Sequence, residues 1–94
     1  MVIGCCTIKL YLPTAHSLKE KRGILKGALA RIGREFNVSV AEIDYQDVWQ
    51  SALLAVVTVS NDAAHAHGRL ARVVEWIEHN RPDVEILDVQ MEMI

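Results

Sequence analysis

The chain has 94 residues, of which 51% are hydrophobic and 23% are charged, and its formal net charge at pH 7 is −2. This composition is typical of a globular protein, and it excludes low-complexity, collagen-like and highly charged disordered chains. A chain of this length can form one core but not two, so we expect a single domain over residues 1–94.

The first element is a strand over residues 2–12, because this segment is rich in β-branched residues and alternates in polarity. One face carries Ile8, Leu10 and Leu12. The other face carries a mixed set: Ile3, Cys5, Thr7, Lys9 and Tyr11. Neighbouring strand residues point to opposite faces, so Cys5 and Cys6 suit neither a disulfide nor a shared metal site.

A helix is predicted to follow Ser17, because Ser17 and Glu20 match the S-x-x-E capping box. Its apolar residues recur at helical spacing and form one stripe: Leu18, Leu25, Ala28, Leu29, Ile32 and Phe36. Asn37 is typical of the left-handed residue at a helix end.

Four further segments complete the chain. Residues 38–43 and 52–60 predict two strands, a second helix starts at Asn61 or Asp62 and ends before Pro82, and residues 84–93 predict the last strand. In the order βαββαβ, right-handed crossovers place both helices on one face of a four-stranded antiparallel sheet. We therefore predict an α+β, ferredoxin-like fold.

The other face of this sheet has no helix over it and carries apolar residues from the first, third and fourth strands. Exposed apolar patches of this kind commonly bind a partner, so we expect a homodimer through the sheet face or along its edge. A protein-interaction or assembly module acting through this uncovered face is one functional hypothesis.

Charge is distributed unevenly along the chain. Residues 1–37 hold seven lysine and arginine residues against two glutamates, and residues 38–94 hold three arginines against ten acidic residues. Five cations are predicted to form a basic patch around the start of the first helix: Lys9, Lys19, Lys21, Arg22 and Lys26. Cations are unfavourable at a helix N-terminus, but a bound phosphate makes the arrangement favourable.

We therefore predict a protein that is not an enzyme and that binds structured RNA or a ribonucleoprotein through this basic patch. A merely solvated helix surface is the alternative interpretation. The aromatic residues needed for base stacking on the sheet are few, with only Tyr11 on the first strand and none on the third, so contact with the RNA backbone is the expected mode.

Catalytic and metal-binding patterns are weak. The loop LPTAHS lacks the glycine and arginine with which acylphosphatases of this fold cradle phosphate, which leaves such a hydrolase as the third hypothesis. His65 and His67 diverge on a helix. Glu42, Asp44 and Asp47 are compatible with a water-bridged Mg²⁺, but a solvated loop explains them better. We predict no catalytic residues, no cofactor and no metal.

The stretch VIGC near the start is similar to a lipoprotein cleavage site, but no basic segment and no long apolar stretch precede it. Lys9 interrupts an apolar run that is too short to span a bilayer. We expect a cytoplasmic protein with no membrane segment.

The stretches PTAHSLKEKRGILK, REFNVSVAEID and QDVWQSA, followed by VTVSND, resemble the YlxP-like family, a bacterial family of unknown function, in the same order over nearly the whole chain. The resemblance implies a ferredoxin-like fold and supplies no established activity or catalytic residues. Genes of family members often lie beside genes for translation initiation and ribosome maturation, which favours an RNA-related role. The basic SLKEKR segment of the family corresponds to Ser17, Lys19, Lys21 and Arg22.

Overall fold

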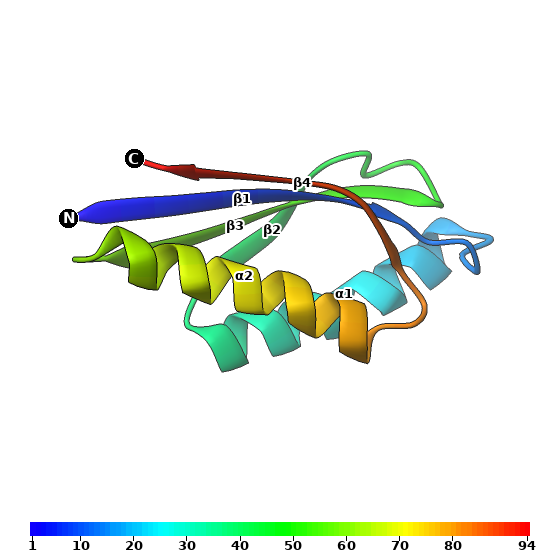
Figure 1. The fold of residues 1–94 in the computed structure, drawn as a ribbon. Coiled ribbons are helices and arrows are strands. Elements are labelled where there is room, and N and C mark those ends of the chain that lie inside the picture. Colours follow the sequence, from blue (N-terminus) through cyan, green and yellow to red (C-terminus); the bar gives the residue numbers. More distant parts are fainter.

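The computed structural model describes all 94 residues. Its elements follow in the predicted order: β1 Val2–Tyr11, α1 Leu18–Phe36, β2 Ser39–Asp44, β3 Ser51–Ser60, α2 Ala63–Asn80 and β4 Glu85–Met93. The strands form one antiparallel sheet in the order β2-β3-β1-β4, and both helices lie on one face of it (Figure 1). The predicted ferredoxin-like fold is confirmed.

α1 starts at the predicted capping box. The Glu20 amide donates a hydrogen bond to Ser17 Oγ at 3.1 Å, and the His16 amide donates one to Glu20 Oε2 at 2.7 Å. The first bond satisfies a helix amide that has no intrahelical acceptor, and the second ties the residue before the cap to the first turn. α1 ends at Asn37, whose φ of 52° and ψ of 53° are the left-handed conformation predicted for it.

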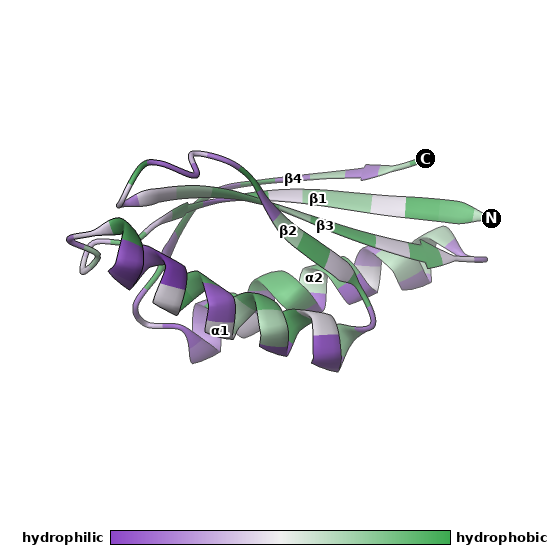
Figure 2. Cartoon of the chain, turned by 180° about the vertical axis from the view of Figure 1, so that it is seen from behind, coloured by the Kyte–Doolittle hydropathy of each residue, from purple (hydrophilic) through white to green (hydrophobic).

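Hydrophilic and hydrophobic residues alternate along α1, as expected for a helix with one face toward a core (Figure 2). α2 is also amphipathic, and the buried residues of its apolar face are Ala66, Leu70, Val73 and Ile77. Neither helix has the length and apolar character that crossing a membrane requires.

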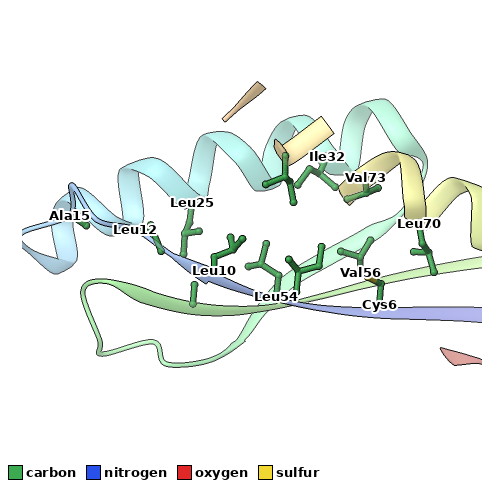
Figure 3. Packing of buried hydrophobic residues seen from close by; sticks show 13 residues of the cluster. Cys6, Leu10, Leu12, Ala15, Leu25, Ile32, Leu54, Val56, Leu70 and Val73 are labelled. Atoms are coloured by element: carbon green, nitrogen blue, oxygen red, sulfur yellow. The ribbon is translucent and has the colours of Figure 1, made fainter. Parts of the chain in front are cut away.

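The core lies between the sheet and the two helices (Figure 3). Alternate side chains of β1 and β3 point toward the helices and are buried: Cys6, Ile8, Leu10, Ala52, Leu54 and Val56. They meet Leu25 and Ile32 from α1, and Leu70 and Val73 from α2. Burial of each valine, leucine or isoleucine side chain among them contributes about 1.5–3 kcal/mol, so this two-layer contact is the main source of stability.

The opposite face of the sheet is not covered by a helix, as predicted, and the connection between β2 and β3 rises on this side (Figure 1). We call it the open face. Large apolar side chains with 46–69% exposure lie on this face, on that connection or at strand ends: Ile43, Val48, Trp49, Val59, Leu87 and Ile94.

Candidate nucleic-acid interface

Three of the five predicted cations lie together on the exposed surface of α1, and we call Lys19, Arg22 and Lys26 the α1 strip. Their spacing of three and four residues places them on one side of the helix, over about 10 Å of its length. No carboxylate lies within ion-pair distance of any of them, because the three ion pairs of the protein involve other residues. The α1 strip is therefore a line of unpaired positive charge.

The α1 strip borders a shallow depression of about 350 Å³ between α1 and β2, lined by Arg22, Leu25, Lys26, Leu29 and Glu42. Long cationic side chains beside apolar surface keep their aliphatic stems on it and their charged ends in water. Glu42 is the one acidic residue of the lining, and its carboxylate is paired with Lys21 rather than with the strip.

Lys21 does not belong to the exposed patch, which corrects the prediction. Its side chain is 1% exposed, its Nζ lies 2.8 Å from Glu42 Oε2, and it donates a hydrogen bond to the Tyr45 carbonyl oxygen. Glu42 Oε2 has no aligned hydrogen bond, so charge attraction holds the pair. A buried charge is costly unless it is paired, and this pairing fixes Lys21 inside the protein. Lys21 joins α1 to the end of β2 and is not available to a phosphate.

Lys9 is also separated from the α1 strip. Its neighbours Ile8 and Leu10 point toward the helices, so Lys9 points to the open face, where its Nζ lies 5.2 Å from the centre of the Tyr45 ring. A patch that joined Lys9 to α1 would have to pass through the sheet. The predicted five-residue patch is thus reduced to the α1 strip.

Several other cationic side chains form contacts within the protein. Arg31 is paired with Glu35 at 2.8 Å, and its guanidinium lies 5.8 Å from the centre of the Trp76 ring. Arg69 donates hydrogen bonds to Thr58 Oγ1 and to the Val59 carbonyl oxygen. These contacts hold α1, α2 and β3 together.

Arg81 pairs with Asp83 at 2.7 Å in the connection before β4. The hydrogen bonds from Arg81 hold the pKa of Asp83 below its ordinary value, more than offsetting its partial burial. Arg34 and Arg72, in contrast, are exposed and have no hydrogen-bond or ion-pair partner, so they are further unpaired cations of the helical layer. Arg72 was not singled out from the sequence, because its availability depends on its neighbours in space.

Charge is sorted by layer in the folded protein. The two helices carry eight lysine and arginine residues against four glutamates, a net charge of +4. The four strands carry one lysine, Lys9, against five carboxylates, a net charge of −4. No group of three or more His, Cys, Asp or Glu side chains is placed to hold a metal ion. The helical layer is therefore net positive and the strand layer net negative.

Comparison with known proteins identifies the family. The family model described as "Protein of unknown function (DUF503)" matches residues 3–91. The "Uncharacterized protein YlxP" of Bacillus subtilis (strain 168) is 38% identical over 84 residues, which cover 89% of this chain and 90% of that protein.

Two designed proteins have a similar fold, each with a TM-score of 0.55 over 100% of this chain. They are the "De novo designed protein Foldit4", at 14% identity and 97% coverage, and the designed protein LFR1 1 with ferredoxin fold, at 16% identity and 84% coverage. At these identities the likeness concerns the fold alone. The match over residues 3–91 and the similarity to YlxP together show that the chain belongs to the DUF503 family of proteins of unknown function.

Proposed function

We propose that this protein is a cytoplasmic, non-enzymatic module that docks on structured RNA or a ribonucleoprotein through the α1 strip. The observation that carries the proposal is the contrast between Lys19, Arg22 and Lys26, which have no carboxylate partner, and the paired cations Lys21 and Arg31 on the same helix. None of the three strip residues forms an ion pair within the protein. A polyanion supplies the partner that they lack.

The α1 strip suits contact with the nucleic-acid backbone. Three cations spaced over about 10 Å along one helix can approach neighbouring phosphates and release condensed counterions. Such contacts position a protein on RNA by its shape and charge, with little dependence on sequence. Structured RNA, whose phosphates are crowded and fixed, is the partner that this geometry favours.

The sheet is the less suitable side for RNA. Recognition of bases on a sheet of this fold uses aromatic side chains on the two central strands. On the open face β1 offers only Tyr11, and β3 offers none. Apart from Glu42, which is paired with Lys21, the strands carry four carboxylates against Lys9, and this excess of negative charge repels phosphate. RNA is therefore expected to approach the helical layer.

Fluorescence anisotropy with a labelled RNA hairpin tests the proposal. The K19Q/R22Q variant should weaken binding at least tenfold near 0.1 M salt, and should lower the slope of log affinity against log salt by about two. The matched control K9Q/R72Q removes the same charge from outside the α1 strip, at exposed or half-buried sites. It should reduce affinity by no more than about threefold, because it affects only the overall field.

Equal losses in the two double variants would mean that only net charge matters, and would overturn the assignment of the α1 strip. Absence of salt-sensitive binding by the wild-type protein to hairpin, internal-loop and single-stranded RNA probes would overturn the RNA proposal itself. Circular dichroism of each variant checks that the fold is unchanged.

A further inference from the structure

The open face has an apolar centre. Alternation along β1 and β3 leaves every second side chain on this side, including Ile3, Cys5, Val57 and Val59. Ile3 is the cross-strand neighbour of Val59, and Cys5 is the neighbour of Val57. Val59 is 59% exposed although it is apolar. Adjacent apolar side chains that no element covers form the kind of patch at which partners bind.

An acidic row borders this apolar centre. Register places Glu92 beside Cys5, Asp88 beside Lys9, and Glu85 beside Tyr11 on the open side of β4. All three carboxylates are exposed and none takes part in an ion pair. Lys9, the only lysine or arginine of the four strands, lies over the Tyr45 ring instead. Asp88 accepts a hydrogen bond from the Gln90 side chain at 3.3 Å, and Lys9 is the one cation beside the row, so three carboxylates outweigh one lysine.

A shallow hollow lies where the apolar centre and the acidic row meet. It has a volume of about 260 Å³ and is lined by Cys5, Thr7, Gln90, Met91 and Glu92. Its lining combines apolar, hydroxyl and amide groups with one carboxylate, that of Glu92. A lysine or arginine side chain matches this combination, because its aliphatic stem can cover Cys5 and Thr7 while its charged end reaches Glu92.

We infer that the open face binds a protein segment whose contact surface combines apolar side chains with lysine or arginine. Burial of apolar side chains over β1 and β3 contributes the binding free energy. The acidic row on β4 favours a positively charged segment and orients it on the face. RNA is excluded as an occupant of this face by the same carboxylates. This inference concerns the face opposite to the α1 strip and does not depend on RNA binding.

A second copy of the chain fits this face less well, although the sequence favours a homodimer. When two open faces stack, the acidic row of one copy lies over strands of the other, and those strands carry no cation except Lys9. Like charges facing each other in an interface cost free energy and disfavour pairing. The charge of the face thus points to a partner of opposite sign.

A synthetic amphipathic helix of leucine and lysine, about 18 residues and roughly 27 Å long, is a direct probe. It should bind the wild-type protein, and a matched leucine–glutamate helix should bind at least tenfold more weakly. The D88N/E92Q variant should lose about fivefold in affinity for the lysine helix, and Val59→Ser about threefold. The control E75Q/E78Q removes the same charge from α2 and should change affinity less than twofold.

Two readouts can overturn the inference. Amide chemical-shift changes on adding the lysine helix should map to β1, β3 and the open side of β4; changes confined to α1 and α2, or equal losses in the two double variants, contradict it. Sedimentation velocity should find monomers over a wide concentration range. A dimer that Val59→Asp dissociates would instead make a second copy the occupant of the open face.

Discussion

The helical layer and the strand layer carry opposite net charges, +4 and −4, yet they meet in one ion pair, Lys21 with Glu42. The other two ion pairs lie within α1 and in the connection before β4. The remaining charges point outward, because an unpaired charge in the core is costly. The opposite charges of the layers therefore do not hold them together, since apolar packing does that.

Removing the single ion pair between the layers should have the largest effect. Lys21→Ala leaves Glu42 without its partner in a site where its side chain is only 18% exposed. We expect a loss of about 3 kcal/mol in the free energy of unfolding, roughly 150-fold in the equilibrium constant, measured by urea denaturation.

Lys19→Ala, on the same helix but in the exposed strip, is the matched control and should change stability by no more than about 0.5 kcal/mol. The double variant K21M/E42L should recover most of the loss, because an apolar pair of similar size needs no charge compensation. A Lys21→Ala protein as stable as Lys19→Ala would show that the buried pair contributes nothing.

The two cysteines can distinguish the faces of the sheet. Cys6 is buried toward the helices, and burial, followed by the charge of Cys5, raises its pKa to about 11. Cys5 lies on the open face and is partly exposed. Since the thiolate is the reactive form, Cys5 should react with a thiol reagent at about pH 8 at least about a hundredfold faster than Cys6.

Cys5→Ser should abolish the fast phase of labelling, and Cys6→Ser should leave it unchanged. Mass spectrometry after brief labelling identifies the modified residue. Fast reaction of both thiols in the native protein would contradict the assignment of the two faces.

The capping box should have a smaller effect. Ser17 Oγ accepts a hydrogen bond from the Glu20 amide, at the end of α1 where positive charge is concentrated. Ser17→Ala should cost about 1 kcal/mol in unfolding free energy, measured by thermal denaturation, whereas Ser17→Asp should preserve stability because aspartate also caps helices. Equal destabilisation by both substitutions would show that the side-chain cap is not the cause.

The Arg81–Asp83 ion pair, which lies outside the two layers, should have the smallest effect on stability. The pKa of Asp83 is lowered in the folded protein, so its contribution to stability is present above the ordinary aspartate pKa of about 3.9 and is lost as the pH falls through the folded value. The pair is partly exposed, so solvent screens it. Asp83→Asn should cost less than about 1 kcal/mol at neutral pH in urea denaturation. The difference from wild type should disappear in acid; a difference that persists there would exclude ionisation as its source.

The sequence predicted the elements well because their signals are local. Alternation in β1, the Ser17–Glu20 capping box and the left-handed Asn37 depend on residues close together in the chain, and all three are confirmed. The open face was predicted for a similar reason, since element order alone places both helices on one side.

The basic patch was predicted less well because it depends on contacts between elements. Lys21 precedes Leu25, Ala28 and Ile32 by four, seven and eleven residues, which places it in the middle of the buried stripe. That spacing could have revealed its burial, but its partner Glu42 could not be identified without the position of β2. Alternation likewise already placed Lys9 on the face away from α1. The opposite net charges of the helical and strand layers became apparent only from the structure, which shows the elements that form each layer.

The separation of charge between the layers also makes the molecule an electric dipole. Apart from the Lys21–Glu42 ion pair, a net three positive and three negative charges remain, and the usual spacing of about 10 Å between packed layers gives a moment of about 30 electron-ångströms. In the field around a polyanion this moment produces a torque that turns the helices inward before any contact forms. The sheet then faces outward, so a molecule captured in this way would present its second surface to whatever arrives next.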